Sequence, residues 1–236
     1  MAYPIRYLPS GHVFINPKDN CDRLVDALLK TGYNEEFCIA ADFNEDFIIR
    51  LMKAGFLVMS AELKDNEKEE SLCILLPKLH LVRSVLFYPD LHIKKSTRKF
   101  LSKYELGVDT DFDLVLDKCV QTHGDDWLTS PLVETLKGIR KSKSPRAKPV
   151  SFAVYRDGEL KAGEIGVVTG RVYTSYSGYH EENNAGMVQM ILMAQWLEKT
   201  GFDFLDFGVP LEYKTKLGAQ NVPSHRFVEL FRAARQ

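Results

Sequence analysis

The chain has 236 residues, of which 45% are hydrophobic and 27% are charged. This is the composition of an ordinary globular protein with a sizeable core, so it excludes a disordered or fibrous chain. The 31 Lys and Arg residues almost balance the 32 Asp and Glu residues, and the formal net charge is -1. Attraction to nucleic acid or to an anionic membrane would therefore have to come from a local patch.

The cysteines and the apolar stretches bear on the compartment. The four cysteines are far apart in sequence and form no CxxC pair, which predicts reduced thiols and neither a zinc knuckle nor a disulfide framework. They are Cys21, Cys38, Cys73 and Cys119. Residues 1–10 lack the apolar core of a signal peptide, and residues 72–88 are too interrupted by polar side chains to span a membrane. We expect a cytoplasmic protein that does not bind membranes.

Two polar runs divide the chain. Residues 61–71 are acidic and residues 141–149 are basic with prolines, so both are predicted to be exposed connections. Before the first run, residues 36–40 predict a short strand, and a helix begins after Asn44, ends at Gly55 and leads into a second short strand. The sequence therefore predicts a small N-terminal domain of residues 1–68 and a larger domain of residues 69–236.

The larger domain begins with a buried strand at residues 81–88 and three helical patterns. The helical patterns cover residues 96–104, 111–121 and 130–141. Three strands then follow at residues 150–155, 160–168 and 171–177, because Asp157-Gly158 and Thr169-Gly170 are strong turn signals. The pattern ends with a helix at residues 185–199, a strand at 202–209, a further helix and a final strand around Phe227.

This order of elements is the topology of the GNAT acyltransferase fold. The predicted fold class is α+β, with a GNAT-like mixed, mostly antiparallel sheet, flanking helices and a small N-terminal α/β unit. In that fold a glycine-rich turn before the long helix usually binds the pyrophosphate of coenzyme A. Here the turn contains Glu181 and Glu182 and neither a Gly-x-Gly nor an Arg. Like charges would repel a diphosphate, so we expect no coenzyme A and no other cofactor.

A series of short motifs runs in order from Arg83 to the C-terminus. They are Arg83-Ser84-Val85-Leu86-Phe87, Leu91-His92-Ile93, Arg98-Lys99-Phe100, Trp127-Leu128-Thr129, Asn183-Asn184-Ala185, Leu205-Asp206 and Leu217-Gly218-Ala219. In order and spacing the set resembles the leucyl/phenylalanyl-tRNA-protein transferases. These GNAT-like enzymes take their acyl group from aminoacyl-tRNA, so the resemblance implies aminoacyl-tRNA as a partner and no need for coenzyme A.

The chain departs from the family pattern at several positions. Ser175-Tyr176-Ser177 corresponds to the family's glycine-glutamate-serine, and Asp206-Phe207-Gly208 corresponds to its aspartate-x-glutamine. The glutamate and the glutamine are therefore absent. Pro77-Lys78 stands where the family has paired tryptophans, and Val58-Met59-Ser60 stands for its proline-tryptophan-phenylalanine. The altered pocket predicts a preference that differs from the usual leucine and phenylalanine.

Five basic side chains cluster within about two turns: Lys94, Lys95, Arg98, Lys99 and Lys103. Such a cluster can neutralise several phosphates of an RNA stem, so it predicts tRNA contact. A solvated helix face is an equal alternative. A second basic run between Lys137 and Lys148 either extends the RNA-binding track or is only a soluble linker.

Asp206 ends a strand inside an apolar run, where an ionised carboxylate is costly without donors. The family resemblance implies that Asp206 binds or orients the incoming amine. The alternative is a strand-end carboxylate bonded to a nearby turn. Tyr176 and Ser177 are predicted to border the reacting carbonyl, and Tyr176 can also stack on the terminal adenine or simply pack in the core.

The remaining substrate-binding candidates are Met59, Trp127, Thr129 and Gly208. Trp127 either walls the side-chain pocket or anchors a helix to the core. His92 lies in one of the family motifs, but a lone histidine at a strand end is more often structural. The histidines have no metal-ligand spacing and no Ser-His-Asp order stands out, so we predict no metal.

Together these features predict an enzyme, an aminoacyltransferase. It would move a leucine- or phenylalanine-like amino acid from aminoacyl-tRNA to the N-terminal amine of a protein or peptide. Two other functions stay open. The chain can be a GNAT-like acyltransferase for a small amine or a cell-wall precursor, or it can be a catalytically inactive relative that only binds RNA.

Overall fold

The computed structural model describes residues 3–65, 70–124, 127–142 and 146–236. Its helices are α1 (Cys21–Thr31), α2 (Glu45–Ala54), α3 (Lys95–Leu101), α4 (Phe112–His123), α5 (Ser130–Lys141), α6 (Ala185–Lys199), α7 (Glu212–Lys216) and α8 (Ser224–Ala234), with a 3-10 turn η1 (Tyr88–Asp90). Its strands are β1 (Leu57–Asp65), β2 (Glu70–Lys78), β3 (Val82–Leu86), β4 (Glu105–Val108), β5 (Lys148–Arg156), β6 (Glu159–Thr169), β7 (Val172–His180), β8 (Phe204–Asp206) and β9 (Gln220–Pro223).

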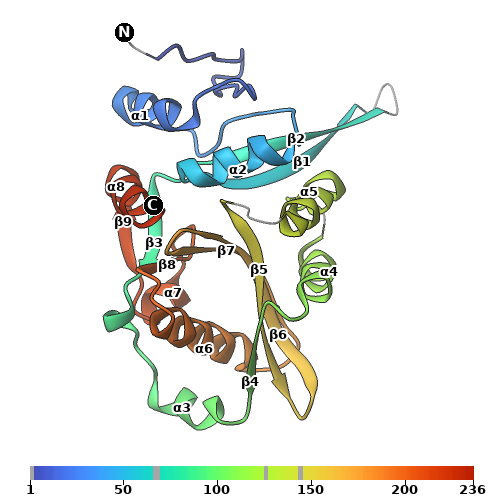
Figure 1. Cartoon of the computed structure of the whole chain (residues 1–236), viewed down its shortest axis with the longest axis vertical. Helices are drawn as coiled ribbons and strands as arrows, with labels where there is room; N and C mark the ends of the chain where they lie inside the picture. The colour runs from blue at the N-terminus through green and yellow to red at the C-terminus, as the bar shows by residue number, and fades with distance from the viewer. Residues whose placement is uncertain (1–2, 66–69, 125–126, 143–145) are drawn as a thin grey trace.

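A seven-stranded mixed sheet in the order β4-β5-β6-β7-β8-β3-β9 forms the centre of the molecule. Neighbouring strands are antiparallel except β7 and β8, which are parallel. The sheet contains the expected meander of β5, β6 and β7, followed by α6 and β8 (Figure 1). The predicted α+β, GNAT-like arrangement of this part of the chain is therefore confirmed.

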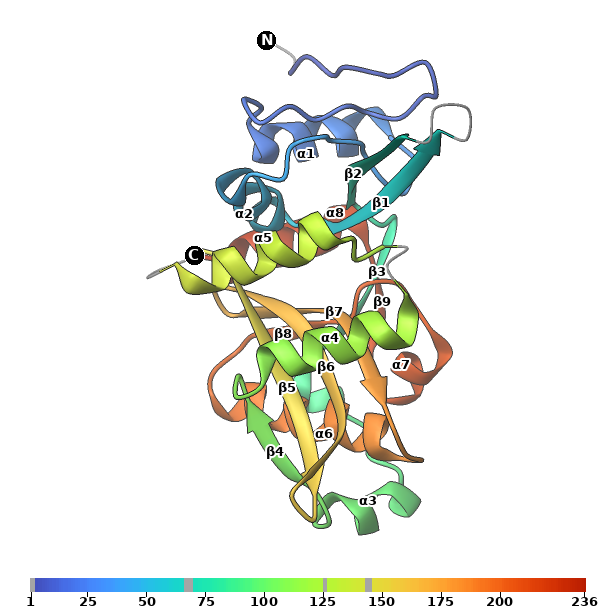
Figure 2. The ribbon, with the colours of Figure 1, turned by 90° about the vertical axis from the view of Figure 1, so that its right-hand side faces the viewer.

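Helices cover both faces of the sheet. Helices α4 and α5 pack on one face and α6 packs on the other (Figures 1 and 2). Leu116 and Leu136 belong to the same buried cluster as Ile165, whereas Phe152 on β5 is buried in a second cluster with Ile191 of α6. Because apolar side chains are buried on both sides, β5 and β6 read as nearly continuous apolar runs with little polar alternation.

In the N-terminal part, α2 has the caps that the sequence predicts. The Asn44 side chain accepts a hydrogen bond from the Phe47 N–H, and Gly55 ends the helix with φ 99°. Residues 36–40 do not form a full strand; they make isolated bridges, Phe37 with Lys78 and Ala40 with Leu75. Helix α1 was not predicted, although the Asn20 side chain caps it and Gly32 ends it.

The acidic run at residues 61–71 was expected to be an exposed connection. Glu62, Leu63 and Ser71 are exposed, but residues 61–65 and 70–71 belong to β1 and β2, so the expected connection is wrong there; residues 66–69 lie outside the described residues. Strands β1 and β2 pair in an antiparallel register from Leu57 opposite Lys78 to Asp65 opposite Glu70. The hairpin projects away from the central sheet (Figure 2), and Leu63 and Leu72, which face each other across it, are exposed. Of the second expected connection, residues 143–145 lie outside the described residues, and Lys141 belongs to α5.

The predicted domain boundary between residues 68 and 69 also lies outside the described residues. The strands on either side of it pair with each other, and one buried cluster includes both Val13 and Phe231. The division into two domains stays a prediction.

The last elements differ from the expected order. Phe227 lies in α8, so a final strand at that position is wrong; the last strand is β9. The reason is the spacing of Phe227, Val228 and Phe231, which places all three on the buried face of one helix. Strand β4 was not predicted, and it follows directly after buried Tyr104, which had been assigned to a helix.

Candidate active site

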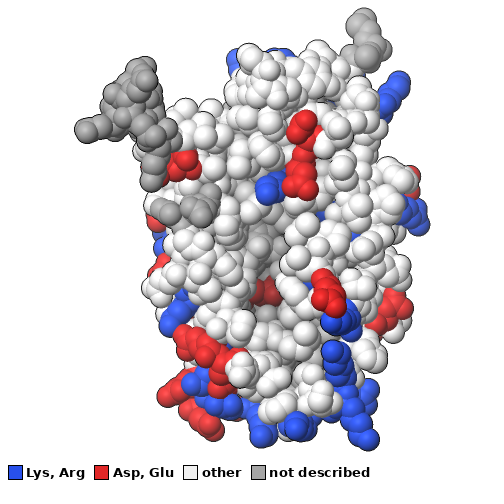
Figure 3. Space-filling model, turned by 180° about the vertical axis from the view of Figure 1, so that it is seen from behind, with Lys and Arg blue, Asp and Glu red and all other residues white. Residues whose placement is uncertain are grey.

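A cavity of about 750 Å³ lies in the C-terminal part of the chain, with walls from β6, β7, α6, α7 and residues 92–97. Figure 3 shows one face of the molecule hollowed near its middle, with acidic atoms at the floor of the hollow. A cavity of this volume is in the range of small-molecule binding sites.

The cavity opens where two parallel strands separate. Strand β7 pairs with β8 only from Val172 to Thr174, since β8 ends at Asp206 while β7 continues to His180. The pairing of β7 with β6 is also irregular, because Ile165 faces Ser177 whereas Gly166 faces Ser175. Tyr176 is the extra residue of this bulge. Bulges redirect side chains beside binding sites, and here both Tyr176 and Ser177 line the cavity.

Tyr176 connects the cavity to the N-terminal part of the chain. Its hydroxyl oxygen accepts a hydrogen bond from the Val58 N–H at 3.2 Å. Burial raises the pKa of the Tyr176 hydroxyl, so the phenol stays protonated at neutral pH. Ser177 is buried, and its carbonyl oxygen accepts a hydrogen bond from the Cys119 thiol at 3.5 Å.

Glu164 on β6 lines the cavity and was missed by the sequence analysis, as was Lys214 on α7. Glu164 has only 4% of its surface exposed, and its Oε1 atom has no hydrogen-bond partner within the described part of the chain. Burial raises the pKa of the Glu164 carboxyl to about 7, although polar groups of Tyr173, Ser175 and Gln189 partly oppose this shift. The available signal was an acid between two glycines, Gly163 and Gly166, inside an apolar strand.

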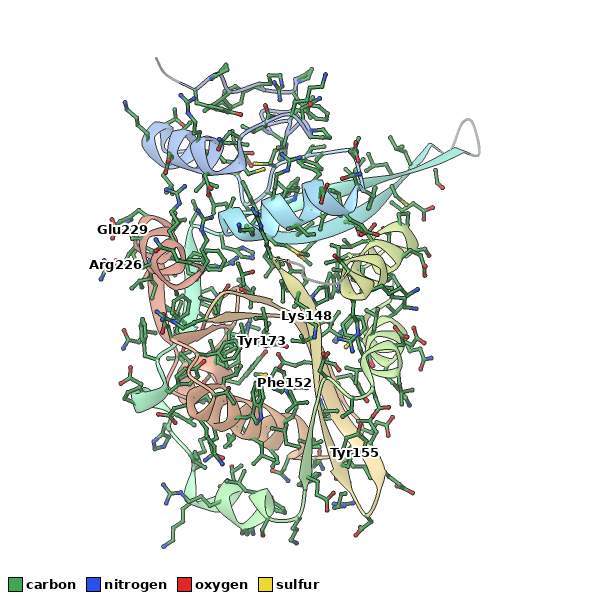
Figure 4. All side chains as sticks on the ribbon, in the orientation of Figure 1. Lys148, Phe152, Tyr155, Tyr173, Arg226 and Glu229 are labelled. Carbon is green, nitrogen blue, oxygen red and sulfur yellow. The ribbon has the colours of Figure 1, made fainter. Side chains whose placement is uncertain are left out.

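Two glycines allow Tyr173 and Glu164 to pack closely against neighbouring strands. Gly166 has no side chain, and a Cβ atom there would lie 2.5 Å from the Tyr173 hydroxyl. Gly178 pairs with Glu164 across the strands, and a Cβ there would lie 3.1 Å from the Glu164 Cβ. The Tyr173 ring packs edge-on against Phe152 at 5.1 Å between centroids, and the two labelled side chains lie together in Figure 4.

Lys214 on α7 places an ammonium group at the same cavity. Its Nζ atom donates hydrogen bonds to the carbonyl oxygens of Phe207 at 2.6 Å and Val209 at 2.9 Å. Burial lowers the pKa of Lys214 to about 8, while Asp206 and Glu164 oppose the shift. A lysine ammonium has three N–H donors, so one remains for a ligand. Such a donor can stabilise a developing oxyanion.

Asp206 does not reach the cavity wall, in contrast to the sequence expectation. The residue is fully buried, and its Oδ2 atom accepts a hydrogen bond from the Arg83 Nη2 atom at 2.8 Å. Its Oδ1 atom accepts one from the Gly208 N–H at 2.9 Å, which makes it the turn-bonded strand-end carboxylate of the alternative interpretation. Gly208 belongs to this turn, with φ 72°, and not to the cavity wall.

The other expected pocket residues meet at the junction of β1 and α5. The Ser60 hydroxyl oxygen accepts hydrogen bonds from the Thr129 N–H at 3.0 Å and from the Thr129 hydroxyl at 2.9 Å. The Ser60 N–H donates to the Trp127 carbonyl oxygen at 3.0 Å. Trp127 and Thr129 therefore lie beside Ser60, the neighbour of Met59, and none of the three predicted residues lines the cavity.

The basic cluster lies beside the cavity. All five of its side chains are exposed, and none forms an ion pair with an acid in the described ranges. Lys94 also lines the cavity, and basic side chains gather over α3 at the lower end of the face in Figure 3. The segment that leads to the cluster is fixed against α7, because the His92 N–H donates to the Leu217 carbonyl oxygen at 2.8 Å. Gly218 permits this approach, since a Cβ there would lie 1.9 Å from the Asp90 oxygen.

The acidic turn before α6 has counter-ions that the sequence did not indicate. Lys118 of α4 pairs with Glu181 at 2.6 Å, and Arg156 of β5 pairs with Glu182 at 2.5 Å. The charge repulsion expected for a diphosphate is therefore smaller than the turn sequence suggests. The absence of a coenzyme A requirement stays a prediction.

The described residues offer neither a cluster of metal ligands nor a membrane-spanning helix. Within the described residues, no group of three or more His, Cys, Asp or Glu side chains is arranged to hold a metal ion. No helix in the same part of the chain has both the length and the apolar character needed to cross a membrane. The predicted absence of a metal stays untested by this geometry.

The sequence is similar to proteins of one known family. The family model described as leucyl/phenylalanyl-tRNA protein transferase matches residues 85–232. The chain is 29% identical over 152 residues to a leucyl/phenylalanyl-tRNA–protein transferase of Pseudomonas putida, over 62% of this chain and 66% of that protein. It is 22% identical over 209 residues to one of Campylobacter jejuni, over 89% of this chain and 90% of that protein.

Solved structures resemble the chain at lower identity. FemX gives a TM-score of 0.47 at 10% identity, over 93% of this chain and 81% of FemX. A GCN5-related N-acetyltransferase from Anabaena variabilis gives a TM-score of 0.41 at 9% identity, over 85% of this chain and 46% of that one.

The chain spans just under two thirds of the Pseudomonas relative, 66% of its length, but the family model covers more than half of the chain. The chain belongs to the leucyl/phenylalanyl-tRNA protein transferase family.

Proposed function

We propose that this protein transfers an amino acid from aminoacyl-tRNA to the N-terminal amine of a protein or peptide in the cytoplasm. Membership of the family supports this function. The observation that carries it is the position of the cavity, which contains Glu164 and Lys214 and opens beside the exposed basic cluster, with Lys94 common to both. A charged tRNA needs these two features side by side, because its ester lies at the end of a phosphate backbone.

The chemistry needs few groups, since the tRNA ester already activates the acyl carbon. The site has to orient the amine, remove a proton from it and stabilise the oxyanion. Lys214 is suited to the oxyanion, and Ser177 and the ring of Tyr176 border the space where the carbonyl would lie. Asp206 acts in this scheme as a positioning residue, because it holds the strand end next to Phe207, which lines the cavity.

Apolar side chains line part of the cavity and give room for the transferred residue. They are Met187, Met190, Ile191, Phe207 and Leu217. A leucine- or phenylalanine-like side chain would be buried among them, and unbranched methionines adapt to more than one shape. This arrangement moves the side-chain pocket from the expected Met59, Trp127, Thr129 and Gly208 to the α6 side of the sheet.

The basic cluster is proposed to hold the acceptor stem. Lys95, Arg98, Lys99 and Lys103 are all exposed near the cavity mouth, where Lys94 lies on its wall. Unpaired cations that neutralise phosphates give binding that weakens steeply with salt. The proposal therefore predicts salt-sensitive binding of tRNA despite the net charge of -1.

The test is transfer of labelled amino acids from a set of charged tRNAs to peptides that begin with Lys or Arg. We expect a labelled N-terminus with leucine- or phenylalanine-like residues, and no label on the matched peptide with an acetylated N-terminus. RNA binding without transfer from any charged tRNA would instead indicate an inactive RNA-binding relative. Acylation of a small amine or a cell-wall precursor, without transfer to any peptide, would indicate the other acyltransferase.

A further inference from the structure

We infer that Glu164 is the proton acceptor for the attacking amine, a role that rests on the proposed function and makes its chemistry specific. Three observations carry the assignment. Glu164 is the acid among the residues that line the cavity, its Oε1 atom lacks a partner in the described structure, and Gly178, which faces it on β7, has no side chain to crowd it.

The position of Glu164 is costly for a purely structural residue. A carboxyl with 4% of its surface exposed loses most of its hydration, and no Lys, Arg or His of the described chain lies within salt-bridge distance of it. A glutamine or methionine would fill the same volume at lower cost. Retaining an ionisable group at a cavity wall is therefore better explained by a proton-transfer role than by packing.

The supply of a carboxyl from β6 fits the departure from the family pattern. Tyr176 on β7 stands where the family resemblance implies a glutamate, and its hydroxyl oxygen accepts a hydrogen bond from the Val58 N–H. Glu164 lies on the neighbouring strand opposite Gly178, two residues beyond Tyr176. A carboxyl is thus supplied to the same cavity from β6 instead of β7.

The step balances without another reactant. The neutral α-amine attacks the ester carbonyl carbon, a C–N bond forms, and the carbonyl π electrons move to the oxygen beside Lys214. The nitrogen then gives one proton to Glu164. When the oxyanion collapses, the bond from carbon to the ribose oxygen of the terminal adenosine breaks, and Glu164 returns the proton to that oxygen. The products are a peptide bond and a free tRNA 3' end.

The protonation state of Glu164 suits this role. With a pKa of about 7, Glu164 is partly ionised near neutral pH, so the carboxylate can accept the proton of the amine and the carboxylic acid can then give it to the leaving oxygen. Charged and titratable groups face Glu164 from three other elements, and they will influence its titration. They are Lys214 and Tyr213 from α7, Tyr173 from β7 and Cys119 from α4.

The test compares Glu164→Gln with the wild type and with Glu159→Gln, an exposed glutamate on the same strand. Transfer to a Lys-initiated peptide is measured as kcat/KM between pH 5.5 and 9, and tRNA affinity is measured by filter binding. We expect Glu164→Gln to lose about 100-fold or more in kcat/KM, to lose the pH-dependent rise near neutrality and to bind tRNA within about twofold of wild type. Glu164→Asp should recover part of the rate, and Glu159→Gln should match the wild type.

The outcomes separate this inference from the function on which it rests. An active wild type with an equally active Glu164→Gln variant and an unchanged pH profile would overturn the role of Glu164 and leave the aminoacyltransferase intact. A wild type that transfers nothing from any charged tRNA would overturn both. A rate loss explained entirely by weaker tRNA binding would also contradict proton transfer by Glu164.

Discussion

Two carboxylates lie on the strands that flank β7 and have opposite surroundings: Glu164 on β6 and Asp206 on β8. Asp206 is fully buried, accepts a hydrogen bond from Arg83 at 2.8 Å and a second from the Gly208 N–H. Glu164 is almost as buried, but it has an unpartnered oxygen and faces a cavity of about 750 Å³. We therefore expect Asp206 to hold the end of β8 in place and Glu164 to exchange a proton.

In the proposed scheme, Glu164 takes the proton-accepting role and the scaffold of the family is kept. The family resemblance marks Asp206 as the reactive acid, whereas the geometry leaves that residue enclosed by an ion pair. A buried acid with a full set of partners stays in one position and stays ionised. A buried acid with an unpartnered oxygen has a raised pKa and can gain or lose a proton near neutral pH.

Removing one partner of the enclosed pair should cost the most stability. Asp206→Ala leaves the Arg83 guanidinium buried without a counter-ion, so we expect the free energy of unfolding to fall by about 3–5 kcal/mol in urea titrations. Arg226→Ala is the matched control, because its pair with Glu229 is exposed at the surface (Figure 4) and should give no measurable change. Equal, small effects of both variants would contradict the structural role of Asp206.

Glu164→Gln should have the reverse effect on stability. The folded-state pKa of about 7 lies above the usual glutamate value of 4.5, so the folded chain binds more protons between these values and wild-type stability falls as pH rises through them. The glutamine variant escapes this loss and should be more stable at pH 8, by on the order of 3 kcal/mol at most. At pH 4 the difference should disappear. A variant less stable than wild type at pH 8 would show that the carboxylate is structural.

Lys214→Met tests the oxyanion donor. We expect kcat to fall by about 100-fold, because the remaining N–H of the ammonium would no longer stabilise the developing charge. Lys199→Met, which changes an exposed lysine at the end of α6, is the control for the loss of a positive charge. The melting temperature of each variant should be measured as well, since Lys214 also holds two carbonyl oxygens. A rise in KM with kcat unchanged would instead show that Lys214 only contributes to binding of the substrate in its ground state.

The smallest expected effect concerns the basic cluster. The double variant Lys95→Ala and Lys99→Ala should weaken tRNA binding by about tenfold and lower the slope of log K against log salt by about two, with kcat unchanged at saturating tRNA. Lys30→Ala and Lys199→Ala remove two exposed lysines elsewhere and serve as the matched control. Equal losses of tRNA affinity in both double variants would show that the cluster is only a solvated helix face.

Local signals predicted much of the scaffold. The Asn44 cap, the Asp157-Gly158 turn and the spacing in residues 185–199 each act within a few residues, and α2, the meander and α6 form where they indicate. The β1–β2 hairpin and β4 were missed because they depend on pairing with distant partners. Tertiary pairing overrides local polarity in such strands.

The site was less accessible to sequence reasoning for the same reason. Arg83 and Asp206 are 123 residues apart, so no spacing could show that they meet. Tyr176 and Ser177 line the cavity, and the strand that carries them and the helix after it form where the sequence predicted; their place beside the reacting carbonyl stays a prediction. Glu164 was overlooked because it lies in an apolar strand, and its energetic cost becomes visible only when its burial and the unpartnered Oε1 atom in the described structure are known.

The most direct measurement compares the transfer rates of Glu164→Gln and Asp206→Asn, each corrected for its folded fraction at pH 7.5. Both substitutions remove a negative charge from this region and keep the shape of the side chain. The account predicts that Glu164→Gln loses about 100-fold or more in kcat/KM, whereas folded Asp206→Asn stays within about tenfold of wild type. A severe loss in Asp206→Asn alongside a fully active Glu164→Gln would contradict it.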